Sequence, residues 1–157
     1  MKAMSRRIVK VLMALLAILL AIQIIRPSRT NPPVDPKATL QAHVEVPPDV
    51  DALLTRACGD CHSHGTRWPW YSTVAPVSWL VANDVNEGRE HLNFSDWEKR
   101  HHHEESPFDQ ICKQIRDGDM PPWYYTLLHP QSRLSTNDVQ AICTWTAGPP
   151  RNRRPAP

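Results

Sequence analysis

The distribution of proline limits which parts of this 157-residue chain can form a packed core. Sixteen prolines stand against five glycines, and ten of the prolines lie in two end segments, 26–48 and 149–157. Proline lacks a backbone N–H and fixes φ, so such segments do not form regular helices or strands. Residues 26–47 are therefore predicted as an extended, Pro-rich linker and residues 149–157 as a disordered basic tail. Residues 48–148 are predicted as one folded domain.

Charge is divided unevenly along the chain, although the net charge is only +2. Between Asp49 and Gly148, 8 Lys and Arg stand against 14 Asp and Glu, so this region carries −6 and the two ends together carry +8. A nucleic-acid-binding domain concentrates Lys and Arg on its folded surface. No nucleic-acid partner is therefore predicted.

The N-terminus combines a basic segment with a long apolar run. Arg6, Arg7 and Lys10 precede Val11–Ile22, in which every residue is apolar. This order is typical of an export signal, and no polar face interrupts the run as it would in a core helix. Ile8–Ile25 approaches the length of a membrane-spanning helix, and no A-x-A cleavage site follows it. Residues 1–25 are predicted as an uncleaved signal anchor on the inner membrane, with the domain in the periplasm; a soluble periplasmic protein after cleavage is the alternative.

Helical patterns run through residues 48–148, and no segment alternates with a period of two. Proline at a first helical position and serine at an N-cap mark several helix starts. The last helix has Ser135 as N-cap and Asp138 three residues later, and it ends at Gly148. The fold class is therefore predicted as all-α. The expected helices begin near Pro48, Pro76, Ser95, Pro107 and Ser135.

Residues 58–62 read Cys-Gly-Asp-Cys-His, a CxxCH motif. This is the attachment signature of c-type haem. Thiols three positions apart lie on one helical turn, so Cys58 and Cys61 can add to the two vinyl groups of one porphyrin, and His62 then presents its imidazole to the iron. The motif predicts one covalent haem c, with thioether links at the two cysteines and His62 as the proximal ligand.

Other roles for these residues stay open. A thioredoxin-like CxxC would need a βαβ context, which the helical pattern lacks. A zinc site from the motif and His64 would place two ligands at adjacent positions, which fits a tetrahedral site poorly. A local disulfide, or two buried thiols, is the remaining alternative.

Two segments around this motif, residues 58–97 and 118–145, resemble the bacterial haem-binding domain family, which is related to monohaem c-type cytochromes. The resemblance covers about Pro48 to Ala147. It implies a small cytochrome c-like domain of four to five helices around one covalent haem, preceded here by the single N-terminal membrane helix. The family is defined by its haem motif rather than by a reaction. His64 and the triple histidine at 101–103 depart from the family pattern.

Met120 stands in the sequence Gly-Asp-Met-Pro-Pro, 58 positions after His62. This context resembles the Met-Pro loop that closes the distal side in small cytochromes c, and the two prolines stiffen the backbone. Met120 is therefore predicted as the distal iron ligand; a core-filling side chain is the alternative. The competing donors are His91, His101, His102, His103 and His129.

Six tryptophans in so small a domain indicate a large apolar partner, which a porphyrin plane supplies. Trp68 and Trp70 follow the motif and are predicted to pack against the haem. Arg67 or an indole N–H is predicted to bond a haem propionate, and an exposed Arg67 is the alternative. The histidines at 101–103 are interpreted as a solvated surface rather than a metal site.

Cys112 and Cys143 lie on the apolar stripes of helices on either side of Met120. In an oxidising compartment two such inward-facing thiols can pair. A Cys112–Cys143 disulfide is therefore predicted; two buried free thiols are the alternative.

Together these features predict electron transfer by a membrane-tethered monohaem c-type cytochrome, not an enzyme. The chain shows no paired carboxylates, Ser-His-Asp order or phosphate loop. The predicted partners are redox proteins, such as other c-type cytochromes or a peroxidase. The alternative is a haem enzyme or gas sensor with an open distal site, where Arg89 or His91 would act on a bound ligand. A module whose haem is purely structural is a third class.

Overall fold

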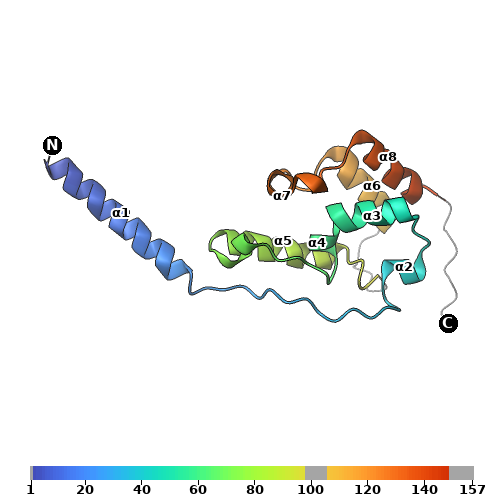
Figure 1. The fold of residues 1–157 in the computed structure, drawn as a ribbon, viewed down its shortest axis with the longest axis horizontal. Coiled ribbons are helices and arrows are strands. Elements are labelled where there is room, and N and C mark those ends of the chain that lie inside the picture. Colours follow the sequence, from blue (N-terminus) through green and yellow to red (C-terminus); the bar gives the residue numbers. More distant parts are fainter. Residues whose placement is uncertain (1, 98–105, 149–157) are drawn as a thin grey trace. The chain divides into compact units, whose positions relative to one another are not determined.

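The computed structural model describes residues 2–97 and 106–148, and every regular element in these ranges is helical (Figure 1). This confirms the all-α prediction. The predicted tail at 149–157 and most of the charged stretch at 96–105 lie outside the described residues. The elements are α1 (Lys2–Ile22), α2 (Leu40–His43), α3 (Pro48–Ala57), α4 (Gly59–His62), η1 (Trp70–Thr73), α5 (Val77–His91), α6 (Pro107–Asp117), α7 (Trp123–Leu128), η2 (Pro130–Ser132) and α8 (Thr136–Thr146).

The chain divides into two compact units, and each is described by itself. The smaller unit contains residues 1–30 and 68–84, and the larger contains residues 31–67 and those from Val85 onward. The helix α5 begins in the smaller unit and continues into the larger one.

In the smaller unit, the residues just after α1 bind the turn before α5. The Gln23 side chain donates to the Ala75 carbonyl at 3.0 Å and accepts from the Ala75 N–H at 3.0 Å. The indole of Trp79 donates to the Ile25 carbonyl at 2.8 Å. These bonds attach the segment at Gln23–Ile25 to Ala75, just before α5, and to Trp79 in the first turn of α5.

The helix α1 covers most of the segment that was predicted as a membrane anchor. Among the described residues, no helix is both long enough and apolar enough to cross a membrane. The predicted membrane helix is therefore not found. The reason is that Arg6, Arg7 and Lys10 lie within α1, so the uninterrupted apolar part of the helix is only Val11–Ile22. A helix of this length spans about 18 Å, whereas the hydrocarbon core of a membrane is roughly 30 Å thick.

The core of the larger unit forms where α3 and α6 pack against α8. Aromatic rings extend this core, since Phe108 lies 5.4 Å from Trp145 and 5.5 Å from Trp97 between ring centroids. The buried cluster contains Leu40, Val50, Leu54, Phe94, Ile111, Ile115, Ile142, Cys143 and Trp145.

One core residue comes from the segment that was predicted as an extended linker. Leu40, in α2, is fully buried, and its N–H donates to the Phe94 carbonyl at 2.8 Å. The Trp97 N–H donates to the Ala38 carbonyl at 2.7 Å. Val44 also packs against the core, and the Gln41 side chain donates to the Asp51 carboxylate at 2.7 Å. Because of these contacts, residues 38–44 pack against the domain instead of extending away from it.

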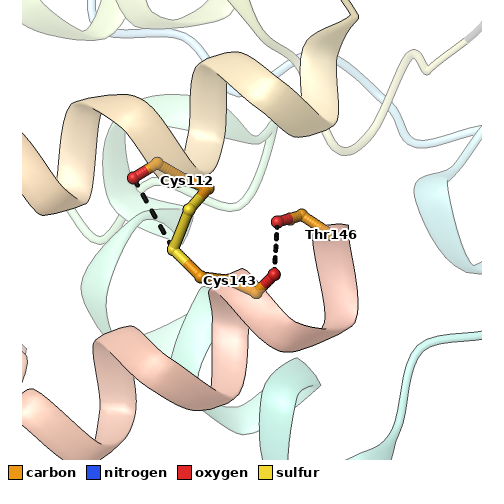
Figure 2. The surroundings of a disulfide bond; sticks show 3 residues. All are labelled: Cys112, Cys143 and Thr146. Atoms are coloured by element: carbon orange, nitrogen blue, oxygen red, sulfur yellow. Dashed lines mark hydrogen bonds between the residues drawn. A yellow bond between two sulfur atoms is a disulfide. The ribbon is translucent and has the colours of Figure 1, made fainter. Parts of the chain in front are cut away.

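The last two long helices carry the predicted cap and the predicted cysteine pair. Ser135 Oγ accepts from the Asp138 N–H, and the Ser135 N–H donates to the Asp138 carboxylate, which forms a capping box. Cys112 of α6 and Cys143 of α8 are joined by a disulfide (Figure 2). The bridge closes a loop that contains Met120 and α7.

Candidate functional site

The CxxCH motif forms a single helical turn at the end of α3. The Cys61 and His62 N–H groups both donate to the Cys58 carbonyl, at 3.1 and 2.9 Å. Cys58 and Cys61 are partly buried and carry reduced thiols, while the other two cysteines of the chain form the disulfide. Burial raises the pKa of the Cys58 thiol to about 12, and nearby Cys61 adds to the shift. The turn therefore presents two reduced thiols beside one imidazole.

The His62 ring is held by main-chain carbonyls. Its Nδ1 lies 3.0 Å from the Leu92 carbonyl oxygen, so the ring donates from Nδ1 and the neutral tautomer keeps its lone pair on Nε2. Burial lowers the pKa of His62, against the opposing effect of the Leu92 and Gly88 carbonyls. The Phe94 N–H donates to the His62 carbonyl at 2.8 Å. A neutral, oriented imidazole of this kind is suited to bind a metal ion.

The second half of α5 lies directly against the motif at Gly88. A Cβ atom at this position would stand 2.8 Å from the Cys61 carbonyl oxygen and 3.1 Å from the Cys61 Cβ. The neighbouring Arg89 donates to the Ser63 carbonyl at 2.8 Å and to Thr66 Oγ1 at 2.9 Å. Gly88 permits the close approach, and Arg89 ties the loop after the motif to α5.

Replacing Gly88 with alanine is expected to disturb the motif, because the new methyl group meets backbone atoms of Cys61 that cannot move alone. Overpacking of this kind costs about 1–3 kcal/mol. Gly59→Ala is the matched control, since a Cβ there meets only the Leu54 carbonyl, at 3.8 Å. The haem content per polypeptide and the thermal midpoint should fall in Gly88→Ala and stay near wild type in Gly59→Ala. Equal values in the two variants would contradict the close-approach argument.

Asp60, inside the motif, is the centre of a polar cluster. Its carboxylate accepts from the Arg67 N–H and Nε at 3.0 Å each and from an Arg67 terminal nitrogen at 3.1 Å. The Tyr125 hydroxyl of α7 donates to the same carboxylate at 2.8 Å. Burial alone would raise the pKa of Asp60, but the bonds from Arg67 and Tyr125 outweigh it and hold the pKa below its ordinary value.

Arg67 was predicted to contact a haem propionate. In the structure its guanidinium is paired with Asp60, and 68% of its side chain is exposed. Trp68 and Trp70, the predicted haem-packing residues, belong to the smaller unit. Trp70 opens η1 and is 79% exposed. Contact of these three residues with a haem stays a prediction.

Met120 lies in the turn between α6 and α7. Gly118 ends α6 with φ at 80°, in the left-handed region where a side chain would be strained. The N–H groups of Asp119 and Met120 then donate to the Gln114 carbonyl at 3.1 and 3.2 Å. This places the Met120 side chain, 38% exposed, directly before α7.

Large apolar side chains near Met120 are left in contact with solvent. Trp123 is 75% exposed, and Leu127, one turn later in α7, is 63% exposed. Side chains of this size are ordinarily buried against an apolar surface. Exposed apolar residues on α7, a Met donor before it and the thiol–imidazole turn at 58–62 together fit a porphyrin.

The zinc alternative is not supported. Among residues 2–97 and 106–148, no cluster of three or more His, Cys, Asp and Glu side chains could hold a metal ion. The His64 ring contacts Asn93 Nδ2 and the Pro33 carbonyl instead, at 3.0 and 3.3 Å. The triple histidine at 101–103 lies outside the described residues.

A helical domain with a reduced CxxCH turn has the residues that haem attachment requires, which is typical of the class of haem-binding domains. The model of the haem-binding domain family matches residues 17–148 of the chain. The chain therefore belongs to the haem-binding domain family. No curated protein and no solved structure matches it.

Proposed function

We propose that this protein is a monohaem c-type cytochrome that carries electrons between redox proteins. One observation carries the proposal: the CxxCH turn keeps two reduced thiols beside an imidazole whose Nδ1 lies 3.0 Å from the Leu92 carbonyl, in a chain whose other cysteines are bridged. Membership of the haem-binding domain family supports the cofactor. The covalent link, the number of haems and the redox role are our proposal.

In this proposal, each residue of the site has a specific role. Cys58 and Cys61 would hold the porphyrin through thioethers, His62 would ligate the iron through Nε2, and the Met120 thioether would be the second protein ligand. When bound, the haem supplies a one-electron couple. The Leu92 carbonyl fixes the imidazole by accepting from Nδ1, and the exposed apolar side chains of α7 would supply apolar surface for the porphyrin to cover.

Export to the periplasm is part of the proposal. The basic and then apolar order of α1 is typical of an export signal, and the Cys112–Cys143 bridge is typical of an oxidising compartment. Sequencing the mature N-terminus, together with separation of membrane and soluble fractions, tests this. A new N-terminus beyond Ile25 would show that the segment is removed on export, and an unprocessed N-terminus would show that it is retained. Recovery of the haem protein only in the cytoplasm would contradict export.

Met120 is expected to decide the behaviour of the distal side. A neutral thioether favours ferrous iron over ferric iron relative to a second imidazole, and it blocks external ligands. The ferric wild-type protein should show a sulfur-to-iron charge-transfer band, and its ferrous form should bind carbon monoxide slowly. Met120→Ala should lose the band and bind carbon monoxide rapidly, whereas Met120→His should restore six-coordination at a lower potential. Arg116→Ala, at an exposed site in the last turn of α6, is the control for local disturbance.

The same spectra separate the proposal from its rival. A five-coordinate wild-type protein that binds carbon monoxide rapidly would favour a haem enzyme or gas sensor with an open distal site. A band that persists in Met120→Ala would show that another residue is the ligand. Absence of any bound haem would refute the proposal altogether.

A further inference from the structure

We propose that the hydrogen bond from Tyr125 to Asp60 is a positioning contact that keeps the Met120 segment closed over the CxxCH turn. The inference rests on the proposed function, because it assigns Tyr125 a part in holding the distal ligand. Tyr125 is five residues after Met120, and Asp60 is two residues before His62. The bond therefore joins the helix that directly follows the Met120 turn to the turn that carries His62.

The acceptor end of this contact is rigid. The Asp60 carboxylate is held by three bonds from Arg67, at 3.0, 3.0 and 3.1 Å, and its backbone carbonyl accepts from Thr66 Oγ1 at 2.7 Å. Each of its carboxylate oxygens thus has a partner within the loop that follows the motif. An acceptor fixed in this way can hold the Tyr125 hydroxyl at 2.8 Å without first being ordered itself.

The donor end belongs to a short, largely exposed helix. The helix α7 has six residues, none of them fully buried, and Trp123 and Leu127 are largely exposed. The Tyr125 ring stacks on the His129 ring, with centroids 4.4 Å apart and an angle of 26° between the planes. Since a short helix is marginal by itself, tertiary contacts such as the bond to Asp60 must supply its position.

A second attachment holds the far end of the same segment. Ser132 Oγ donates to the Arg56 carbonyl at 2.7 Å, and the Arg56 guanidinium donates to the Gln131 carbonyl and, at 3.0 Å, to the Arg133 carbonyl. Arg56 lies in the last turn of α3, directly before the motif. Ser132 Oγ also lies 3.5 Å from the Tyr125 hydroxyl, but its shorter bond to the Arg56 carbonyl does not need that hydroxyl. Loss of the Tyr125 bond to Asp60 should therefore open the Met120 end without unfolding the domain.

The experiment compares Tyr125→Phe with Thr126→Val in the full, haem-loaded chain. Tyr125→Phe removes the donor and keeps the ring that stacks on His129. The control removes the next hydroxyl along α7, whose bond to the Trp123 carbonyl at 3.0 Å stays within the helix. A hydrogen bond to a charged acceptor corresponds to a factor of about ten or more in an equilibrium. We therefore expect carbon monoxide to bind ferrous Tyr125→Phe about tenfold faster, and the sulfur-to-iron band of its ferric form to fade at a lower temperature. Thr126→Val should match the wild type.

A double variant checks that the effect passes through Asp60. If the two side chains act through one bond, Asp60→Asn/Tyr125→Phe should bind carbon monoxide no faster than the quicker of the two single variants. Additive effects of the two changes would overturn the inference.

The remaining outcomes separate this inference from the proposed function. A wild-type protein with the sulfur-to-iron band, and a Tyr125→Phe variant with unchanged band and carbon monoxide rate, would overturn the positioning role and leave the cytochrome proposal intact. A lower thermal midpoint without change in either readout would also overturn it, since it would show only structural support. A wild-type protein without the band would overturn the assignment of Met120 and this inference with it.

Discussion

Replacing both Cys58 and Cys61 with alanine is expected to abolish covalent haem, so that the intact mass of the exported protein equals that of the polypeptide alone. The two thiols lie on one helical turn, where the Cys61 N–H donates to the Cys58 carbonyl at 3.1 Å, and both are reduced. Removing both takes away both attachment points while leaving His62 in place. In the wild type, the mass should exceed that of the polypeptide by one haem, and the haem should resist acid-acetone extraction.

The two single variants test how much each cysteine contributes to haem attachment. Cys58→Ala and Cys61→Ala should each keep one thioether and therefore a covalent haem of altered spectrum. A Cys112→Ala/Cys143→Ala variant is the matched control, because it also removes two cysteines but leaves the CxxCH turn intact. Covalent haem in the Cys58→Ala/Cys61→Ala variant, or haem that extracts freely from the wild type, would exclude c-type attachment.

The longer helices of the domain could be predicted because their ends carry local signals. Pro48 and Pro107 stand at first helical positions, and Ser135 caps α8 with a capping box. Each of these helices also has apolar residues at helical spacing, which α3, α6 and α8 bury in one core. Local chemistry and the packing of the domain agree at these positions.

The short helices could not be predicted in this way. The helix α2 has four residues, and its place depends on burial of Leu40 and on a bond to Phe94 that is distant in sequence. The six residues of α7 bury none of their side chains completely. Helices of this length are stabilised by tertiary contacts rather than by their own periodicity, so a pattern of residues carries little signal for them.

The same distinction, between local signals and contacts distant in sequence, applies to the residues of the site. The cysteines and His62 could be predicted because attachment requires fixed residue types at a fixed spacing. The group that orients His62 is the Leu92 main-chain carbonyl, which leaves no trace in residue type. Gly88 is needed for the approach of α5 to Cys61, a contact between residues far apart in the chain. Arg67, predicted as a propionate partner, is paired with Asp60, since the turn after the motif brings these two side chains together.

Loss of the Cys112–Cys143 bridge is expected to lower the stability of the haem-loaded protein by about 3–4 kcal/mol, because the bridge closes a 31-residue separation and restricts the unfolded chain. For a domain of this size, that corresponds to a fall in the thermal midpoint on the order of 15 °C. Urea unfolding of Cys112→Ala/Cys143→Ala against the wild type measures the difference. Since the bridge joins α6 to α8 and encloses the Met120 segment, the sulfur-to-iron band should disappear at a lower urea concentration in the variant.

Reduction of the wild-type protein separates the covalent link from the packing of the two side chains. Cys143 is buried, so its replacement by alanine also removes packed atoms, whereas reduction leaves both sulfur atoms in the core. If loop closure is the main cause, the reduced wild type and the double alanine variant should lose similar stability. Thiol titration under denaturing, non-reducing conditions checks the premise. The haem-loaded wild type should contain no titratable thiol, because two cysteines are bridged and two are held as thioethers, and two titratable thiols would exclude the bridge.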